Sequence, residues 1–126
     1  MSDNEQQIYM QISNKIKEKY LDAQITNQKL SINQTKYPAV SIVLTNNSVL
    51  SQYSTFDQIE SVCNEVFEFE VANSHESGMS DVKAILIIID EQMNEFGYLR
   101  IQQGLIEDKE INDIRRLAKY EKLITK

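Results

Sequence analysis

An alternating run in the middle of the chain constrains the fold more than any other feature. The run Glu-Val-Phe-Glu-Phe-Glu-Val places Phe67, Phe69 and Val71 on one side of an extended backbone. The carboxylates of Glu68 and Glu70 fall on the opposite side. This pattern predicts a strand with one face in the core and one face in water, as is common in antiparallel sheets.

A helix is predicted after a polar break, over about residues 80–96. Ser80 is a residue type that caps helices, and Asp81 in the first turn complements the helix dipole. The residues that follow form one apolar stripe with spacings of three and four: Val82, Ile85, Leu86, Ile89, Met93 and Phe96. Gly97 comes next, where a left-handed helix end is easiest. The β-rich run of residues 85–89 makes a buried strand the alternative, but the length of the stripe and the glycine favour the helix.

The N-terminal part of the chain is predicted to form a helix from about Asn4 to Leu21. Its apolar residues recur at helical spacing: Ile8 or Tyr9, Ile12, Ile16 and Tyr20. Residues 23–36 are rich in Asn, Gln, Thr and Ser, whose side chains bond locally to the backbone. A loop or a weak strand is therefore expected over these residues.

A second strand is predicted to begin at Pro38, because proline fits the first position of a strand. Apolar residues follow at every second position: Val40, Ile42 and Leu44. The polar residues 46–48 predict a turn, and residues 49–61 predict a connection that packs partly on the core. A connection of this length is unusual in a compact domain, so it contains a short strand or is ordered by a neighbouring subunit.

The last two elements are marked less clearly. Residues 98–103 are expected to be extended. Within residues 111–125, a helix would suit Ile111, Ile114, Leu117 or Ala118, and Glu121. One face of a strand would instead carry Ile114, Arg116, Ala118 and Tyr120. Periodicity alone slightly favours the helix.

Length and composition are those of one globular domain. A chain of 126 residues can bury about two thirds of its unfolded surface, so a single domain over 1–126 is expected. The net charge of −6 argues against sequence-independent binding to nucleic acid. The single cysteine excludes an internal disulfide and fits a reducing cytosol. No stretch approaches the length of an apolar membrane span, so we expect a soluble protein with neither signal peptide nor membrane partner.

The inventory of reactive side chains predicts no catalytic residues, no metal site and no cofactor, and hence no enzyme. His75 is the only histidine, so one chain cannot build a multi-histidine zinc site, and its polar loop predicts a solvated side chain. Cys63 is expected to be a buried thiol, because nothing orients a base beside it. The acidic pair Asp90-Glu91 and the acidic loop 107–110 do not match a calcium-binding loop. The glycines are isolated, which excludes a phosphate-binding loop.

One group of basic and aromatic residues stands out in the C-terminal part of the chain: Arg100, Arg115, Arg116, Lys119 and Tyr120. It suits either nucleic acid or an ion-paired subunit interface. The abundance of carboxylates in the chain favours the interface.

Three stretches of the sequence carry a resemblance to a known family. They are the alternating run 66–71, the helix end 89–98, and the closing stretch 112–120. In the second, an aspartate and then a large apolar residue precede Phe-Gly, and the third reads Asn-Asp-Ile-Arg-Arg-Leu-Ala-Lys-Tyr. Their order and content resemble the tail terminator (tail completion) proteins of long-tailed bacteriophages.

The resemblance implies an α+β fold. It has a mainly antiparallel sheet of about four strands, flanked by an N-terminal helix and a central helix at about residues 80–96. It also implies that residues 113–122 form a strand of this sheet, against the slight preference of the periodicity.

The resemblance further implies a structural virion protein. Such a protein forms a homo-oligomeric ring, usually of six copies, that caps the tail tube, ends its polymerisation and forms the tail side of the head–tail junction. The implied partners are other copies of the chain, the tail tube protein and the head-completion or connector proteins, with DNA passing through without specific binding. The implied location is the virion, and the host cytoplasm during assembly.

Charge segregation along the strands suggests residues for the subunit interface of such a ring. Opposite charges across a seam fix register more than affinity. On one subunit the candidates are Arg115, Arg116, Lys119 and Tyr120. On its neighbour they are Glu68, Glu70 and Asp90.

Two other functions remain open at this point. A head-closure or adaptor protein of the phage neck shares the size and the α+β character, and a small cytosolic binding module is the alternative outside the virion. An enzyme whose site is completed between subunits would need more histidine, cysteine or clustered carboxylate than the chain has.

Overall fold

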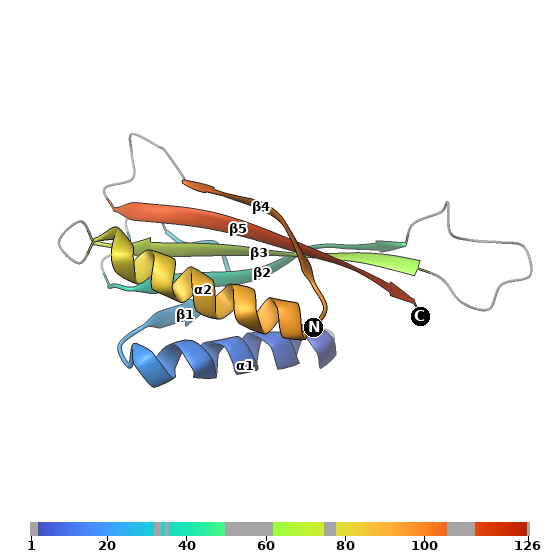
Figure 1. The fold of residues 1–126 in the computed structure, drawn as a ribbon, viewed down its shortest axis with the longest axis horizontal. Helices are drawn as coiled ribbons and strands as arrows, with labels where there is room; N and C mark the ends of the chain where they lie inside the picture. The colour runs from blue at the N-terminus through green and yellow to red at the C-terminus, as the bar shows by residue number, and fades with distance from the viewer. Residues whose placement is uncertain are drawn as a thin grey trace, which may run out of the picture.

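The computed structural model describes residues 3–31, 34, 36–49, 62–74, 78–105 and 113–125. These residues form an α+β fold in which two helices lie on one face of a five-stranded sheet (Figure 1). In chain order the elements are α1 (Asp3–Lys19), β1 (Gln24–Thr26), β2 (Ala39–Val49), β3 (Val62–Asn73), α2 (Met79–Glu95), β4 (Leu99–Leu105) and β5 (Ile114–Thr125).

The sheet is mixed, with the strand order β1-β2-β3-β5-β4. The short β1 runs parallel to β2, and all other neighbours are antiparallel. The expected α+β class and the mainly antiparallel pairing agree with this arrangement. The sheet has five strands rather than about four, because β1 forms within the segment for which a loop or a weak strand was expected.

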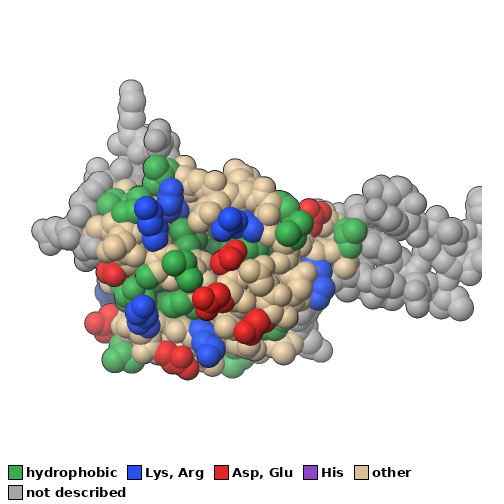
Figure 2. Space-filling view, in the orientation of Figure 1, with side chains coloured by type: hydrophobic (Ala, Val, Ile, Leu, Met, Phe, Trp, Pro, Cys, Tyr) green, Lys and Arg blue, Asp and Glu red, His purple; other side chains and the backbone are tan. Residues whose placement is uncertain are grey.

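The core lies between the helices and the inner face of the sheet. The alternation of β3 is confirmed, since Phe67, Phe69 and Val71 are all 0% exposed. The predicted apolar stripes of both helices are buried, except that Tyr20 and Phe96 at their ends are only partly buried. The helices contribute Ile8, Ile12, Ile16, Val82, Ile85, Leu86, Ile89 and Met93, and the strands add Val40, Ile42, Ala118 and Tyr120. On the outside of the helix layer, charged side chains of both signs are interspersed with hydrophobic ones (Figure 2).

The two ends of α2 differ in how well the sequence predicts them. Gly97 has φ 87° directly after the helix, as predicted for a left-handed helix end. The predicted cap at Ser80 is wrong, because Gly78 occupies the cap position and Ser80 lies inside the first turn. The amide of Asn73 donates a 3.2 Å hydrogen bond to the carbonyl oxygen of Gly78, and the helix begins at Met79.

The final segment is a strand, so the slight preference of the periodicity for a helix is wrong. β5 lies between β3 and β4 and pairs with both. Its pairing with β3 extends from Ile114 opposite Asn73 to Thr125 opposite Val62. Hydrogen bonding on both edges outweighs the weak helical period of one short segment.

The turn predicted at residues 46–48 is also wrong, because β2 continues to Val49 and these residues pair with β3. The register shifts between Leu44 and Asn46, so the polar residues are accommodated by an irregularity in the strand rather than by a turn.

Several predictions lie outside the described residues. They concern His75, the side chain of Cys63, the acidic loop 107–110 and the connection beyond Val49.

Candidate functional site

The face of the sheet that the helices do not cover is the main candidate surface for binding. Figure 1 shows α1 and α2 together on the other face, where their buried residues join one core. We call the opposite face the outer face. The side chains of paired residues on adjacent strands point to the same face of the sheet, so the strand register shows which residues lie on the outer face. From β3 and β5 they are Val66, Glu68, Glu70, Arg115, Leu117, Lys119, Glu121 and Leu123. The outer face therefore mixes charged and apolar side chains.

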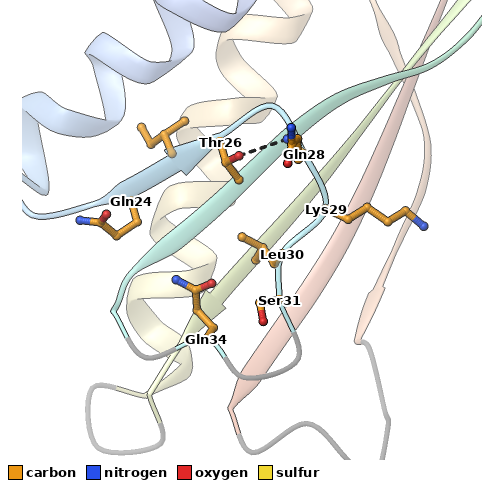
Figure 3. Close-up of a pocket in the computed structure, with 8 residues that line it drawn as sticks. Gln24, Thr26, Gln28, Lys29, Leu30, Ser31 and Gln34 are labelled. Carbon is orange, nitrogen blue, oxygen red and sulfur yellow. Dashed lines mark hydrogen bonds between the residues drawn. The ribbon is translucent and has the colours of Figure 1, made fainter.

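The segment that follows β1 covers one end of the outer face. The hydroxyl of Ser41 in β2 donates a 2.9 Å hydrogen bond to the carbonyl oxygen of Gln28. Together with β1, this segment lines a pocket of about 290 Å³, whose side chains are mainly amides and hydroxyls (Figure 3). Lys29 is the only charged side chain among the described residues that line it. These residues therefore supply no acid and base pair of the kind that catalysis requires.

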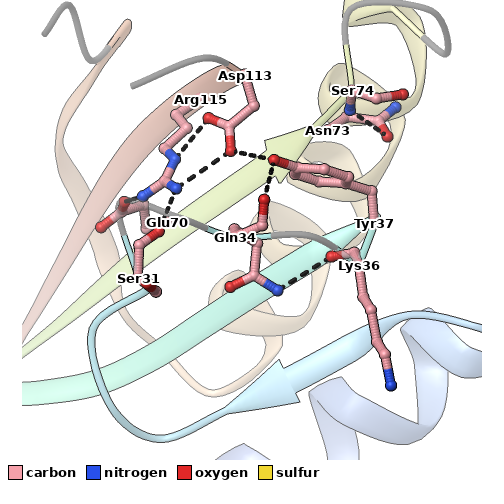
Figure 4. A network of polar contacts seen from close by, with 9 residues as sticks. All are labelled: Ser31, Gln34, Lys36, Tyr37, Glu70, Asn73, Ser74, Asp113 and Arg115. Atoms are coloured by element: carbon pink, nitrogen blue, oxygen red, sulfur yellow. Dashed lines mark hydrogen bonds and ion pairs between the residues drawn. The ribbon is translucent and has the colours of Figure 1, made fainter. Parts of the chain in front are cut away.

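Arg115 is the charged side chain at the centre of the covered end, and it is only 2% exposed. Its Nε and Nη2 donate to the two carboxylate oxygens of Asp113 at 2.6 and 3.1 Å (Figure 4). Its Nη1 donates to Oε1 of Glu70 at 3.1 Å, and Nη2 also donates to the carbonyl oxygen of Ser31. The guanidinium thus joins β5, β3 and the segment after β1. We call these contacts, with those of Tyr37 below, the Arg115 network.

Tyr37 extends the Arg115 network towards the start of β2. Its hydroxyl lies 2.7 Å from Oδ2 of Asp113 and 2.7 Å from the carbonyl oxygen of Gln34, and both are acceptors. Burial raises the pKa of Tyr37, and the hydrogen bond and charge of Asp113 raise it further, to about 12. Burial opposes the charge on Arg115, but Asp113 and Glu70 together raise the pKa of Arg115 above its usual value. At neutral pH Tyr37 and Arg115 therefore keep their protons, and the role of the network is to position the backbone.

A second polar cluster joins α2 to the sheet on the inner face. The hydroxyl of Tyr120 donates a 2.9 Å hydrogen bond to Oδ1 of Asp90, and Nη1 of Arg100 lies 3.6 Å from the same oxygen. Burial raises the pKa of Tyr120 well above its usual value, and the hydrogen bond and charge of Asp90 add to the shift. Asp90 is thus a junction between α2, β4 and β5.

The residues predicted for the subunit interface do not form one patch, because alternation along β5 divides them between the two faces. The outer face carries Glu68, Glu70, Arg115 and Lys119, and the inner face carries Arg116 and Tyr120. Asp90 lies on α2 and contacts Tyr120 from the helix layer.

Two of the charge pairs that the sequence suggested between subunits form within one chain. Arg115 contacts Glu70, and Nζ of Lys119 lies 3.9 Å from Oε2 of Glu68. Arg115 and Tyr120 are 2% and 1% exposed, so both make their contacts inside the subunit. Lys119 keeps 34% of its side chain exposed and stays available at the surface.

Sequence reasoning missed the partners that bury Arg115. Asp113 stands two residues before Arg115, a spacing that places both side chains on one face of an extended chain, so this pair could have been predicted. The contributions of Ser31 and Tyr37 could not, because both are remote from Arg115 in the sequence and are brought there by the parallel pairing of β1 with β2.

Metal-binding groups, membrane-spanning helices and similarity to known proteins give few constraints on the function. Among the residues that the structure describes, no three His, Cys, Asp or Glu side chains are grouped to hold a metal ion. None of the described helices is long and apolar enough to cross a membrane. No family model matches the chain, and no curated protein matches its sequence.

Proposed function

We propose that the protein is a tail terminator of a long-tailed bacteriophage. In this role it forms a ring of identical subunits that caps the tail tube and provides the tail side of the head–tail junction. The observation that carries the proposal is the exposed outer face of the sheet. A face that combines exposed leucines with partly exposed charges suits contact with other protein chains.

The composition of the outer face supports an assembly role. Leu99 and Leu123 are 71% and 50% exposed, and the register places both on this face next to Glu121. Lys119 and Glu68 are partly exposed at its centre. A closed ring uses two different patches of each subunit, and apolar contacts flanked by charges would give such a seam both affinity and register.

The order of the elements also supports the proposal. The resemblance to tail terminators implies a strand, a helix that ends at Phe-Gly, an extended segment and a closing strand. The chain has this order in β3, α2, β4 and β5. The stretch Asp113–Tyr120, which carries much of the resemblance, leads into β5 at the interior of the sheet.

The partners follow from this role. Copies of the chain would occupy the ring, the tail tube protein would meet one side of it, and head-completion or connector proteins would meet the other. DNA would pass through without specific binding, in keeping with a net charge of −6.

Deletion of the gene for this protein from the phage genome tests the proposal. Without a terminator, tube polymerisation loses its stop signal, so electron microscopy of the lysate should show tails longer than normal and unattached heads. Tails of normal length that merely lack heads would indicate the alternative, a head-closure or adaptor protein of the neck. Normal particles, or failure to detect the protein in purified virions by mass spectrometry, would contradict both and favour a cytosolic binding module.

A second test uses the isolated protein. Light scattering after gel filtration should give a mass that is a multiple of 14.6 kDa, and negative-stain images should show rings, alone or on the ends of added tail tubes. A monomer that leaves tube length and tube ends unchanged would overturn the proposal.

A further inference from the structure

The strand β4 lies at one edge of the sheet. It is last in the strand order, and within the described residues only β5 pairs with it. Leu99, Ile101 and Leu105 are 71%, 47% and 52% exposed. The strand contains neither proline nor lysine, and its edge-protecting features are limited to Arg100 and a register irregularity between Arg100 and Gln102. An apolar edge of this kind can accept a further strand.

A groove lies beside this edge, between α2 and the strands β4 and β5, and its volume is about 370 Å³. Lys83, Leu86 and Ile87 of α2 line one wall, and Gln103 and Arg116 line the other. Figure 2 looks onto this side of the molecule, where basic and hydrophobic side chains lie next to one another. Ile87 is 59% exposed, so the wall formed by α2 includes an open apolar side chain beside its charged ones.

The groove carries an excess of positive charge, although the whole chain is acidic. Its cations are Lys83, Arg100 and Arg116, and its carboxylates are Asp90 and Glu91. Asp90 pairs with Arg100 and accepts a hydrogen bond from Tyr120, so Lys83 and Arg116 remain against the single carboxylate of Glu91. The groove therefore offers cations to an incoming acidic group.

Arg116 is the cation best placed to receive that group. Its Nε is buried and has no hydrogen-bond partner among the described residues, and none of their carboxylates pairs with it. A buried donor without a partner is unfavourable, and a carboxylate in the groove would supply the missing acceptor. Leu105 lies opposite Arg116 in the pairing of β4 with β5, so the cation and the exposed edge adjoin.

We propose that this groove binds an extended segment of a different protein. The segment adds to the free edge of β4 as a further strand, so that alternate side chains point towards α2. One of these is a carboxylate that pairs with Arg116, and its neighbours on the same face are apolar and pack on Ile87 and Leu105. This inference goes beyond the tail proposal and does not depend on it.

Charge explains why the occupant differs from the edge strands of this chain. A second copy of β4 would bring Arg100 to a groove that is already cationic, and β4 contains no carboxylate. The part of β2 that extends past its pairing with β1 contains none either. An acidic and apolar segment from another protein supplies the complementary charge.

A peptide selection tests the proposal. A displayed library of random peptides is selected against the immobilised full-length protein, and the enriched peptides are measured by fluorescence polarisation. We expect an acidic residue with apolar residues two positions away on either side. Methylation of alternate peptide amides should abolish binding in one register and leave it intact in the other, because only one set of amides pairs with β4.

Variants of the groove complete the test. Arg116→Gln should weaken binding about tenfold or more, equivalent to about 1.4 kcal/mol, through loss of the charged partner. Lys15→Gln, an exposed position on α1, should leave binding unchanged and serves as the matched control. Circular dichroism establishes that both variants are folded.

Three results would overturn the proposal. The first is a selection that enriches no peptide, or only peptides without an acidic residue. The second is equal binding by Arg116→Gln and the unaltered protein. The third is a change in the oligomeric mass of the protein alone on Arg116→Gln, which would make a second copy the occupant.

Discussion

The guanidinium of Arg115 and the carboxylate of Asp113 form a buried two-point ion pair, with Nε–Oδ1 and Nη2–Oδ2 distances of 2.6 and 3.1 Å. Their side chains are 1% and 2% exposed. Glu70 and the carbonyl oxygen of Ser31 complete the shell around the guanidinium. A buried pair of this kind contributes little relative to an apolar replacement of both partners, but removal of one partner leaves a buried charge without compensation.

Replacement of Arg115 by methionine should therefore destabilise the protein strongly. We expect the free energy of unfolding to fall by about 3 kcal/mol or more, because Asp113 and Glu70 lose their shared cation. Urea unfolding followed by circular dichroism measures the change. Lys119→Met is the matched control, since its partly exposed pair with Glu68 at 3.9 Å should be worth about 1 kcal/mol or less. Equal effects of the two substitutions would contradict a structural role for the Arg115 network.

The tyrosines predict a change in stability at high pH. The pKa of Tyr37 is raised from 10.0 to about 12 in the folded chain. Its stabilising effect is complete below pH 10, where both states hold the proton, and is lost as the pH rises from 10 towards 12. Stability should therefore fall over this range. Tyr37→Phe should show a shallower fall, which unfolding curves at several pH values measure.

Ultraviolet titration gives an independent readout of the same groups. Tyrosinate absorbance should reveal late ionisation of Tyr37 and Tyr120, whose pKa values are both raised by burial and by an acidic partner. Tyr37→Phe should remove one late ionisation and leave that of Tyr120 in place. A titration of the folded protein in which every tyrosine ionises near its ordinary pKa would count against both polar clusters.

The backbone conformation of Gly97 predicts that a side chain at this position destabilises the end of α2. Its φ of 87° is strained for any residue with a side chain, and an added Cβ would lie 3.2 Å from Nζ of Lys122. Gly97→Ala should therefore lower the free energy of unfolding by about 1 kcal/mol. Gly104→Ala is the control, because its φ is not in this region and its surroundings are open. Thermal unfolding should show a lower midpoint for the first variant only.

The elements that the sequence predicts well are those in which local and tertiary preferences agree. Phe67, Phe69 and Val71 alternate as a strand requires, and the same three side chains are the ones that the core buries. Gly97 ends a long apolar stripe and has the positive φ that a helix end favours. In both places the residues that determine the local structure are close together in the sequence, so their pattern predicts it without knowledge of distant contacts.

The elements that the sequence does not predict depend on distant partners. β5 is a strand because it forms hydrogen bonds with β3 and β4. The spacing of apolar residues within β5 does not indicate these partners. The polar residues after Leu44 stay in β2 for the same reason. The division of Lys119 and Arg116 between two faces follows directly from the strand assignment. Once β5 is known to be a strand, alternation alone separates them.

The exposed leucines of the outer face predict an effect on assembly that is separate from stability. Leu99 and Leu123 are 71% and 50% exposed, so the double change Leu99→Gln and Leu123→Gln should alter the free energy of unfolding by no more than about 0.5 kcal/mol per site. If the ring buries this face, each leucine contributes up to about 1.5–3 kcal/mol to the contact, and association should weaken at least about tenfold. Light scattering over a range of protein concentrations measures the shift towards monomer. Leu21→Gln is the matched control, because Leu21 is 83% exposed just beyond α1 and is remote from the outer face. Unchanged association in the double variant, or an equal loss in Leu21→Gln, would place the subunit contact elsewhere on the chain.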